Sequence, residues 1–322
     1  MELVERSLYF RTHAQVDKFP IYACPACHNI LENSSENVLR CPQEGTSFTK
    51  KNNIWRFLPP NRAEHYKRFM QEYEKIRQAE GRGCKDPAFY LELPFKDLSG
   101  KFVEDWKIRS ISYLTLVKKI VQPLHKRTER PLKILDLGAG NGWLSNRLTH
   151  LGHQVVALDI LTNTFDGLGA CVHYPRPFAL VQSEFDRTPF SHGLFDLIIF
   201  NASWHYSESY VKSLQEALRI LDRNGRVVIL DSPIYNNPNS GAQMVQERAN
   251  YFLKSYGLPS DALKSENYLT FQKLAALAKR FNLSWRVVKP NYGWKWRLKP
   301  LQARIRRRRE PAQFLILEGR KN

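Results

Sequence analysis

Three glycines at alternate positions, with an aspartate two residues before the first, are the residues of this chain whose spacing says most about chemistry. The run from Lys133 to Trp143 contains Asp136, Gly138, Gly140 and Gly142, and it begins with an apolar segment. Glycine lets the backbone turn sharply and approach a ligand closely, and the free N–H groups at the start of a following helix favour anionic groups. The run therefore predicts a strand, a turn and a helix start that bind a nucleotide-type ligand.

An acidic residue at the end of the next apolar run supports this prediction. Asp159 follows residues 154–158 and stands where a second strand is expected to end. A carboxylate at that position of a parallel sheet can accept hydrogen bonds from both hydroxyls of a ribose. A strand-end cap is the other role for Asp159, and the neighbouring glycine run favours the ligand role.

The elements around these residues alternate in the way that a parallel sheet covered on both faces requires. Strand runs are followed by segments whose apolar residues recur at helical spacing. The predicted fold is α/β: a doubly wound, Rossmann-like, mostly parallel seven-stranded sheet. The predicted strands are 133–137, 154–159, 179–182, 195–201, 226–231, 285–288 and 313–318, and the predicted helices between them are 142–151, 208–221 and 270–281.

Two further units precede this domain, which is predicted to span residues 131–322. Residues 1–60 are short runs broken by Pro, Asn, Gly and paired Cys, and they are predicted to form a small module that ends at a Pro-Pro pair. Residues 61–130 are predicted to form a helical linker and lid, with amphipathic helices at 63–80 and around 106–124. Tyr73, Arg77 and Glu80 of the first helix are expected to cover a ligand site, and a solvated helix surface is the other interpretation of Arg77 and Glu80.

The glycine run resembles motif I of the class I S-adenosylmethionine-dependent methyltransferases. Its G-x-G-x-G spacing, preceded by Asp136, differs from the G-x-G-x-x-G of dinucleotide enzymes. Residues 155–159 resemble motif II, and residues 181–190 and 195–201 agree with the methyltransferase type 11 group. The resemblance covers about residues 131–235, and it implies S-adenosyl-L-methionine as the cofactor.

The same resemblance implies a role for individual residues. Asp159 would hold the ribose, and Glu184 stands where the family's acid meets the adenine amino group. Phe185 would pack on the adenine ring or lie in the core, and Asn201 follows the fourth strand, where the methyl donor faces its acceptor. The three glycines would line the methionine part of the cofactor. The full predicted cofactor-binding set is Asp136, Gly138, Gly140, Asn141, Gly142, Asp159, Glu184, Phe185 and Asn201.

A histidine shortly after the fourth strand is the candidate general base. Methyl transfer from a sulfonium is an in-line displacement, so positioning and exclusion of water can supply most of the acceleration. A base helps when the acceptor is a hydroxyl or a protonated amine, and His is suited to this near neutral pH. The predicted catalytic residues are His205 and Asn201, with Trp204 and Tyr206 as walls of the acceptor pocket. A structural role is the other interpretation of His205.

Three cysteines near the start of the chain have the spacing of a metal site. Cys24-Pro-Ala-Cys27 is followed by Cys41-Pro-Gln-Glu44, which resembles a zinc ribbon with Glu44 in place of the fourth Cys. These four residues are the predicted Zn²⁺ ligands, with His28 as an alternative ligand and a metal-free ribbon as the alternative state. The module is also similar to that of the 23S ribosomal RNA guanine-N1 methyltransferases, in which a His stands where this chain has Gly45.

The net charge of the chain is +18, and one segment supplies more than half of this excess. Residues 286–309 contain ten Lys or Arg and no Asp or Glu, and Trp285, Tyr292, Trp294 and Trp296 are interleaved with them. Residues 285–309 are therefore predicted to form a basic aromatic insertion. Cations neutralise phosphates while aromatic rings stack on bases, so the segment suits RNA. It suits an anionic membrane surface equally well, and a solvated insertion is the third interpretation.

A methyltransferase is therefore the predicted function, acting on RNA or on a small or lipid-linked metabolite. The alternative is a non-catalytic protein that uses the same fold to bind S-adenosylmethionine or nucleic acid.

Five cysteines, an odd number, argue against a disulfide framework, and residues 1–10 lack the pattern of a signal peptide. No apolar run is long enough to span a bilayer, so a cytoplasmic location is expected.

Overall fold

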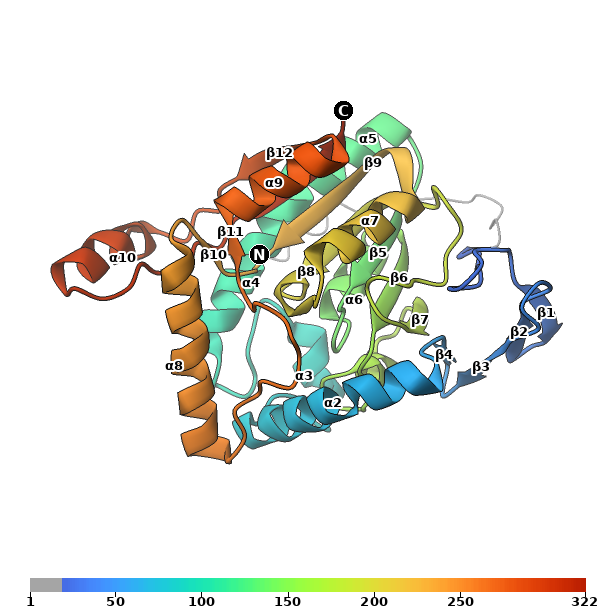
Figure 1. Cartoon of the computed structure of the whole chain (residues 1–322), viewed down its shortest axis with the longest axis horizontal. Helices are drawn as coiled ribbons and strands as arrows, with labels where there is room; N and C mark the ends of the chain where they lie inside the picture. The colour runs from blue at the N-terminus through green and yellow to red at the C-terminus, as the bar shows by residue number, and fades with distance from the viewer. Residues whose placement is uncertain (1–18) are drawn as a thin grey trace.

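The computed structural model describes residues 19–322. Residues 1–18, which contain the segment used to predict that there is no signal peptide, lie outside the described residues. A central sheet has helices on both faces, and the long helix α2 (Pro60–Glu80) runs along its lower edge in Figure 1. Among the described residues, no helix is both long and apolar enough to cross a membrane.

Seven strands form the centre of the sheet. The first five strands in the spatial order given below are parallel to one another, and the sixth is antiparallel to both of its neighbours. The predicted mostly parallel seven-stranded sheet is thereby confirmed. Its order is β7 (Ala179–Gln182), β6 (Gln154–Asp159), β5 (Lys133–Leu137), β8 (Phe195–Asn201), β9 (Leu221–Leu230), β13 (Ile316–Lys321) and β12 (Leu283–Val288).

The apolar sequence of the central strands explains why helices cover both faces. Every residue of β8 is buried, as expected of a parallel strand between two helical layers. Successive side chains point to opposite faces, so Ile134 and Leu135 of β5 belong to different hydrophobic clusters. One cluster includes α7 (Tyr210–Ile220) and α9 (Phe271–Phe281), and the other includes α4 (Val103–Leu116) and α6 (Trp143–His150).

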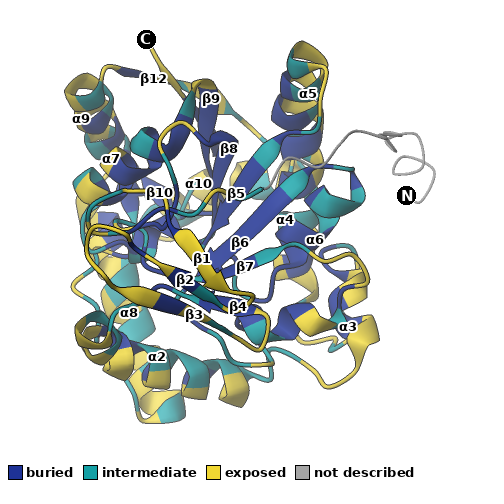
Figure 2. Cartoon of the chain, turned by 90° about the vertical axis from the view of Figure 1, so that its right-hand side faces the viewer, coloured by how far each residue is buried: buried dark blue, intermediate teal, exposed yellow. Residues whose placement is uncertain are grey.

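The N-terminal module adds four strands to one edge of this sheet. They are β1 (Glu32–Ser35), β2 (Val38–Arg40), β3 (Ser47–Lys51) and β4 (Ile54–Arg56), and β4 pairs in parallel with β7. The result is a continuous sheet of 11 strands in which β1 is the exposed edge (Figure 2). The module therefore covers an edge of the core that would otherwise present unpaired backbone groups.

The segment between the module and β5 is helical, as its apolar spacing predicts. The helix predicted around 106–124 is interrupted by a π-helical turn at Val117–Val121, which joins α4 to α5. A short helix that the sequence analysis did not predict lies between the two expected helices. This short helix is α3 (Pro87–Glu92), and the helix that follows the π-helical turn is α5 (Gln122–Thr128).

Most of the unpredicted structure follows β9. The long helix α8 (Pro238–Tyr256) and the paired short strands β10 (Ile234–Tyr235) and β11 (Leu269–Thr270) lie in a region that carried no prediction. The basic aromatic insertion, residues 285–309, also contains regular secondary structure. Its first residues, 285–288, belong to β12, and it continues into the helix α10 (Trp294–Ile305).

Candidate functional site

A cavity of about 1090 Å³, open to solvent, lies at the carboxyl ends of the central strands. The carboxyl ends of β5, β6 and β8 supply Gly138, Asp159 and Asn201, which is where ligands bind in open α/β sheets. Helix α2 supplies the opposite wall through Tyr66, Phe69, Tyr73 and Arg77.

The glycine turn between β5 and α6 makes close contacts that leave no room for a side chain at Gly138 or Gly142. Gly138, Gly140 and Gly142 all have positive φ angles, of 77°, 55° and 75°, which glycine adopts without strain. A Cβ on Gly138 would lie 2.3 Å from the Cβ of Ser203. Asn141 Oδ1 accepts a hydrogen bond of 3.3 Å from the N–H of Trp143, the first residue of α6. The turn therefore brings bare backbone to the cavity.

Asp159 is held in place by two backbone N–H groups. Its Oδ2 accepts a hydrogen bond from Gly140 N and its Oδ1 accepts one from Leu161 N, both at 2.8 Å. A carboxylate has about four acceptor positions, so two remain for hydroxyl donors in the cavity. Burial raises the pKa of Asp159 to about 6, although the two N–H groups act in the opposite direction.

Asp136 lies beneath the turn and is not part of the cavity wall. Its Oδ2 accepts a hydrogen bond of 2.8 Å from the Ser145 hydroxyl, while its Oδ1 is buried without a hydrogen-bond partner among the described residues. Burial raises its pKa to about 7. Gly142 also lies outside the wall, whereas Asn141 and Phe185 line it.

Glu184 lines the cavity but is already engaged by helix α2. Arg62 Nη2 lies 2.7 Å from Glu184 Oε2, and the hydroxyl of Tyr66 donates to the same oxygen at 3.0 Å. The lid has further attachments, since His65 Nε2 lies 2.8 Å from Glu208 Oε2 and Arg77 Nε lies 2.5 Å from Asp166 Oδ2. These contacts fasten α2 over the cavity.

The part of the cavity between the lid and α4 is aromatic. The ring centroids of Phe69, Tyr73 and Tyr206 lie between 5.6 and 6.1 Å from one another. Trp106 of α4 continues this wall. Such a surface can pack against an apolar or aromatic group of a ligand.

Arg109 is a cation in this aromatic wall. Its guanidinium carbon lies 5.0 Å from the centre of the Trp106 ring, and no hydrogen bond or ion pair joins it to another described residue. Burial lowers its pKa, while Asp231 acts in the opposite direction. Arg77, the other arginine of the wall, is paired with Asp166. Arg109 is therefore available to an anionic group that enters the cavity.

The predicted catalytic pair is divided between the cavity and the core. Asn201 lines the cavity, and its Oδ1 is buried without a hydrogen-bond partner among residues 19–322. His205 lies behind the wall, with Nδ1 3.2 Å from Ser232 Oγ, and burial lowers its pKa to about 3. Tyr206 lines the cavity as expected, whereas Trp204 is fully buried. The catalytic role of His205 stays a prediction, and its position favours the structural interpretation.

Several residues of the wall were missed by the sequence analysis. Tyr66, Trp106, Arg109 and Asp166 lie outside the four motifs, as does Arg62, which contacts the wall residue Glu184, and their place depends on how the helices pack. A signal existed for one of them. Arg109 follows Trp106 by three residues, so an arginine shares the core-facing side of an amphipathic helix.

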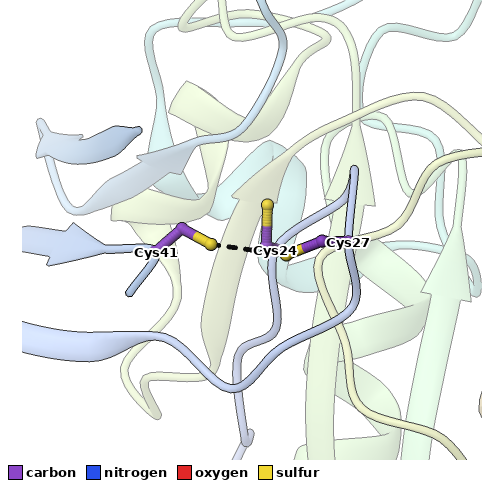
Figure 3. Close-up of side chains that lie close together, drawn as sticks. All are labelled: Cys24, Cys27 and Cys41. Atoms are coloured by element: carbon purple, nitrogen blue, oxygen red, sulfur yellow. Dashed lines mark hydrogen bonds between the residues drawn. The ribbon is translucent and has the colours of Figure 1, made fainter. Parts of the chain in front are cut away.

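The three predicted cysteine ligands lie together in the N-terminal module (Figure 3). The sulfur atoms of Cys24, Cys27 and Cys41 are all within 4.8 Å of one another, and those of Cys27 and Cys41 are 3.4 Å apart. Glu44 directs its backbone N–H, not its carboxylate, to the Cys41 sulfur at 3.3 Å, and its carboxylate is not part of the cluster. Three thiols suit zinc, and Glu44 is not placed as the fourth ligand.

The comparisons with known proteins concern the centre of the chain. Residues 135–229 match the family model described as "Methyltransferase domain". A malonyl-[acyl-carrier protein] O-methyltransferase of Legionella pneumophila is 32% identical over 97 residues, which are 30% of this chain and 34% of that protein. A demethylmenaquinone methyltransferase of Beutenbergia cavernae is 33% identical over 100 residues, 31% of this chain and 40% of that protein. The chain thus spans little more than a third of the length of these relatives.

Among solved structures, an S-adenosylmethionine dependent methyltransferase from Mesorhizobium loti is similar, with a TM-score of 0.42 and 17% identity over 59% of this chain and 91% of that chain. The family match begins in β5 and ends in β9, so it contains the glycine turn, Asp159 and Asn201. The chain therefore carries, over residues 135–229, a methyltransferase domain of the class I S-adenosylmethionine-dependent type.

Proposed function

We propose that the protein binds S-adenosylmethionine in the cavity beneath α2 and transfers its methyl group to a small or lipid-linked acceptor that carries an anionic group. The observation that carries the choice of acceptor is Arg109, a cation in an aromatic cavity wall that has no ion-pair partner among residues 19–322. The methyltransferase domain at residues 135–229 supports the reaction class.

The residues of the wall fit the cofactor. When bound, S-adenosylmethionine supplies an electrophilic methyl group on a positively charged sulfur. The glycine turn offers backbone to its methionine part, and Asp159 keeps two acceptor positions for ribose hydroxyls. Asn201 offers a carbonyl oxygen that has no partner among the described residues. Glu184 would accept a hydrogen bond from the adenine amino group while it keeps its contacts to Arg62 and Tyr66.

The charge balance of the wall also favours a cationic donor. Five carboxyl groups line the cavity, those of Asp159, Asp166, Glu184, Asp186 and Glu208. Three of them are paired with Arg77, Arg62 and His65, which leaves Asp159 and Asp186 against the single guanidinium group of Arg109. A site with this excess of negative charge attracts a sulfonium and repels a polyanion. This supports a metabolite rather than RNA as the acceptor, because binding of RNA needs several cations at the phosphates.

The protein's own contribution to catalysis is then to position the acceptor and to exclude water. The lid α2 is fastened by Glu184, Glu208 and Asp166, so reactants are enclosed between it and the strand ends. Arg109 would hold the anionic group of the acceptor, and the aromatic wall would pack against the apolar part of the acceptor. An acceptor that is already ionised, such as a carboxylate, needs no base, which is compatible with His205 lying behind the wall.

The name of the Legionella relative agrees with this acceptor class. That protein is named for O-methylation of a malonyl group, and a malonyl group carries a carboxylate. The open cavity argues against the alternative of a non-catalytic protein whose cleft is filled by side chains.

We also propose that the three cysteines bind one Zn²⁺ ion. The buried thiols of Cys24 and Cys41 lie beside that of Cys27, and a backbone N–H points at the Cys41 sulfur, as is favourable for a metal-bound thiolate. The fourth ligand would come from outside the cysteine cluster.

The affinity for S-adenosylhomocysteine is expected to fall as the pH is lowered. Since the pKa of Asp159 is raised to about 6, its carboxyl becomes protonated below that pH and loses acceptor positions for the ribose. The dissociation constant should rise about tenfold between pH 7 and pH 5. Calorimetric titration at both pH values measures this, and Asp159→Asn should bind weakly at both. An affinity that is equal at pH 5 and pH 7 contradicts the role of Asp159.

Replacing Arg109 by Leu is expected to slow methylation of the acceptor without weakening the binding of the cofactor. Transfer of radiolabelled methyl groups to a panel of aliphatic and aromatic carboxylic acids should show kcat/KM lower by about 10- to 100-fold, the worth of a charge-assisted hydrogen bond. Arg109→Lys should recover part of the loss, and Arg223→Leu, an exposed change on β9, should have no effect. If Arg109→Leu methylates these acids at the wild-type rate, or loses S-adenosylhomocysteine binding to the same degree, the acceptor role is wrong.

Metal analysis tests the zinc proposal. Protein purified from zinc-supplemented medium should contain about one zinc per chain, and Cys41→Ser should remove most of it because three thiolates are the ligands. Cys84→Ser is the matched control, since Cys84 is exposed and outside the cluster. Wild-type protein with zinc well below one equivalent would refute the site.

A further inference from the structure

Helix α10 carries an apolar stripe that is exposed to solvent. Trp294, Leu298, Leu301 and Ile305 are 68%, 38%, 55% and 72% exposed. They are spaced by four, three and four residues, and a helix turns by about 100° per residue, so they share one face. Four large exposed side chains on one helix face are unusual in a protein without a partner at that surface.

The opposite face of α10 attaches the helix to the body of the protein. Trp296 lies half a turn away from the stripe and packs between Tyr292 and Phe314, with ring centroids 5.0 and 5.8 Å away. The hydroxyl of Tyr292 lies 2.8 Å from that of Ser112 on α4. The stripe is therefore the outward face, and Figure 1 shows α10 standing away from the layers, beyond α8.

Cations border the stripe on both sides. At about 100° per residue, Arg297 and Arg304 fall on one side of it and Lys295 and Arg306 on the other. Residues 306–309 are four consecutive arginines at the end of the helix. They line a groove of about 1030 Å³ against α8, in which Arg309 is paired with Glu247 at 2.7 Å. The apolar face is thus framed by groups that attract phosphates.

A partner for this surface must offer apolar area and negative charge together. An anionic bilayer does so, because Trp, Leu and Ile side chains enter the headgroup boundary while flanking Lys and Arg meet lipid phosphates. RNA would pair with the cations but would leave Leu298, Leu301 and Ile305 in water. The convex, projecting position of the helix matches a flat surface better than a closed groove.

We propose that α10 is an interfacial helix that docks the protein on an anionic lipid surface. The apolar stripe enters the boundary of the bilayer, and the bordering arginines and lysines contact the headgroup phosphates. Docking does not require methyl transfer. It does place α4, which supplies both Ser112 to the root of α10 and Arg109 to the cavity wall, next to the membrane-facing segment.

Vesicle flotation with the full chain tests this proposal. The protein should float with vesicles of phosphatidylcholine and phosphatidylglycerol at about three to one, and much more weakly with phosphatidylcholine alone. The variant Leu298→Ser/Leu301→Ser/Ile305→Ser should bind at least about tenfold more weakly. Neutralising Arg306, Arg307 and Arg308 to Gln should weaken binding by about fivefold per cation at low salt.

Two controls separate docking from loss of fold. Val103→Ser/Val172→Ser removes exposed apolar side chains elsewhere, 53% and 77% exposed, and should float as the wild type does. All variants should keep the wild-type circular dichroism spectrum. Anionic vesicles should also shift the tryptophan emission to shorter wavelength, and Trp294→Phe should remove most of that shift.

Three results would overturn the proposal. The first is no flotation with anionic vesicles. The second is flotation that the triple serine variant retains in full, which would assign binding to charges elsewhere. The third is binding of single-stranded polyuridylate that is lost with the three arginines and kept by the serine variant, without vesicle binding, which would assign α10 to RNA.

Discussion

The carboxyl ends of β5, β6 and β8 meet at a backbone turn that has no room for a Cβ at Gly138, and the rest of the site depends on this close approach. A side chain at Gly138 would collide with Ser203, which follows β8. Because the turn is bare and left-handed at three positions, Gly140 can donate its N–H to Asp159 at the end of β6. One constraint thus sets the distance between three strands and orients the carboxylate that faces the ligand.

The N-terminal module reaches the site through the sheet and is not an isolated appendage. Strand β4 pairs with β7, and Arg56 Nη1 donates to Gln182 Oε1 at 3.1 Å. Two residues beyond Gln182 stands Glu184, which fastens the lid helix that starts shortly after β4. The N-terminal module, the edge of the sheet and the lid are therefore joined by direct contacts on the adenine side of the proposed cofactor site.

The sequence predicted the sheet well because each central strand is a continuous apolar run and each turn at its end carries a chemically distinctive residue. The same features brought Gly138, Asp159, Glu184 and Asn201 to one cavity, which the strand order requires. Arg109 and the lid contacts could not be placed, since they depend on how α2 and α4 pack across long stretches of sequence. The spacing placed Glu44 beside the cysteines but could not tell that its backbone N–H, and not its carboxylate, faces the Cys41 sulfur. Helix α8 was missed because its few buried residues leave no apolar stripe to detect.

The central claim is that S-adenosylmethionine binds between the glycine turn and α2. A crystal structure of the protein with S-adenosylhomocysteine tests it most directly. The account predicts density for the ligand in this cavity, with both ribose hydroxyls on Asp159 and the adenine next to Phe185. An empty cavity at saturating ligand, or a ligand bound elsewhere on the chain, would contradict it.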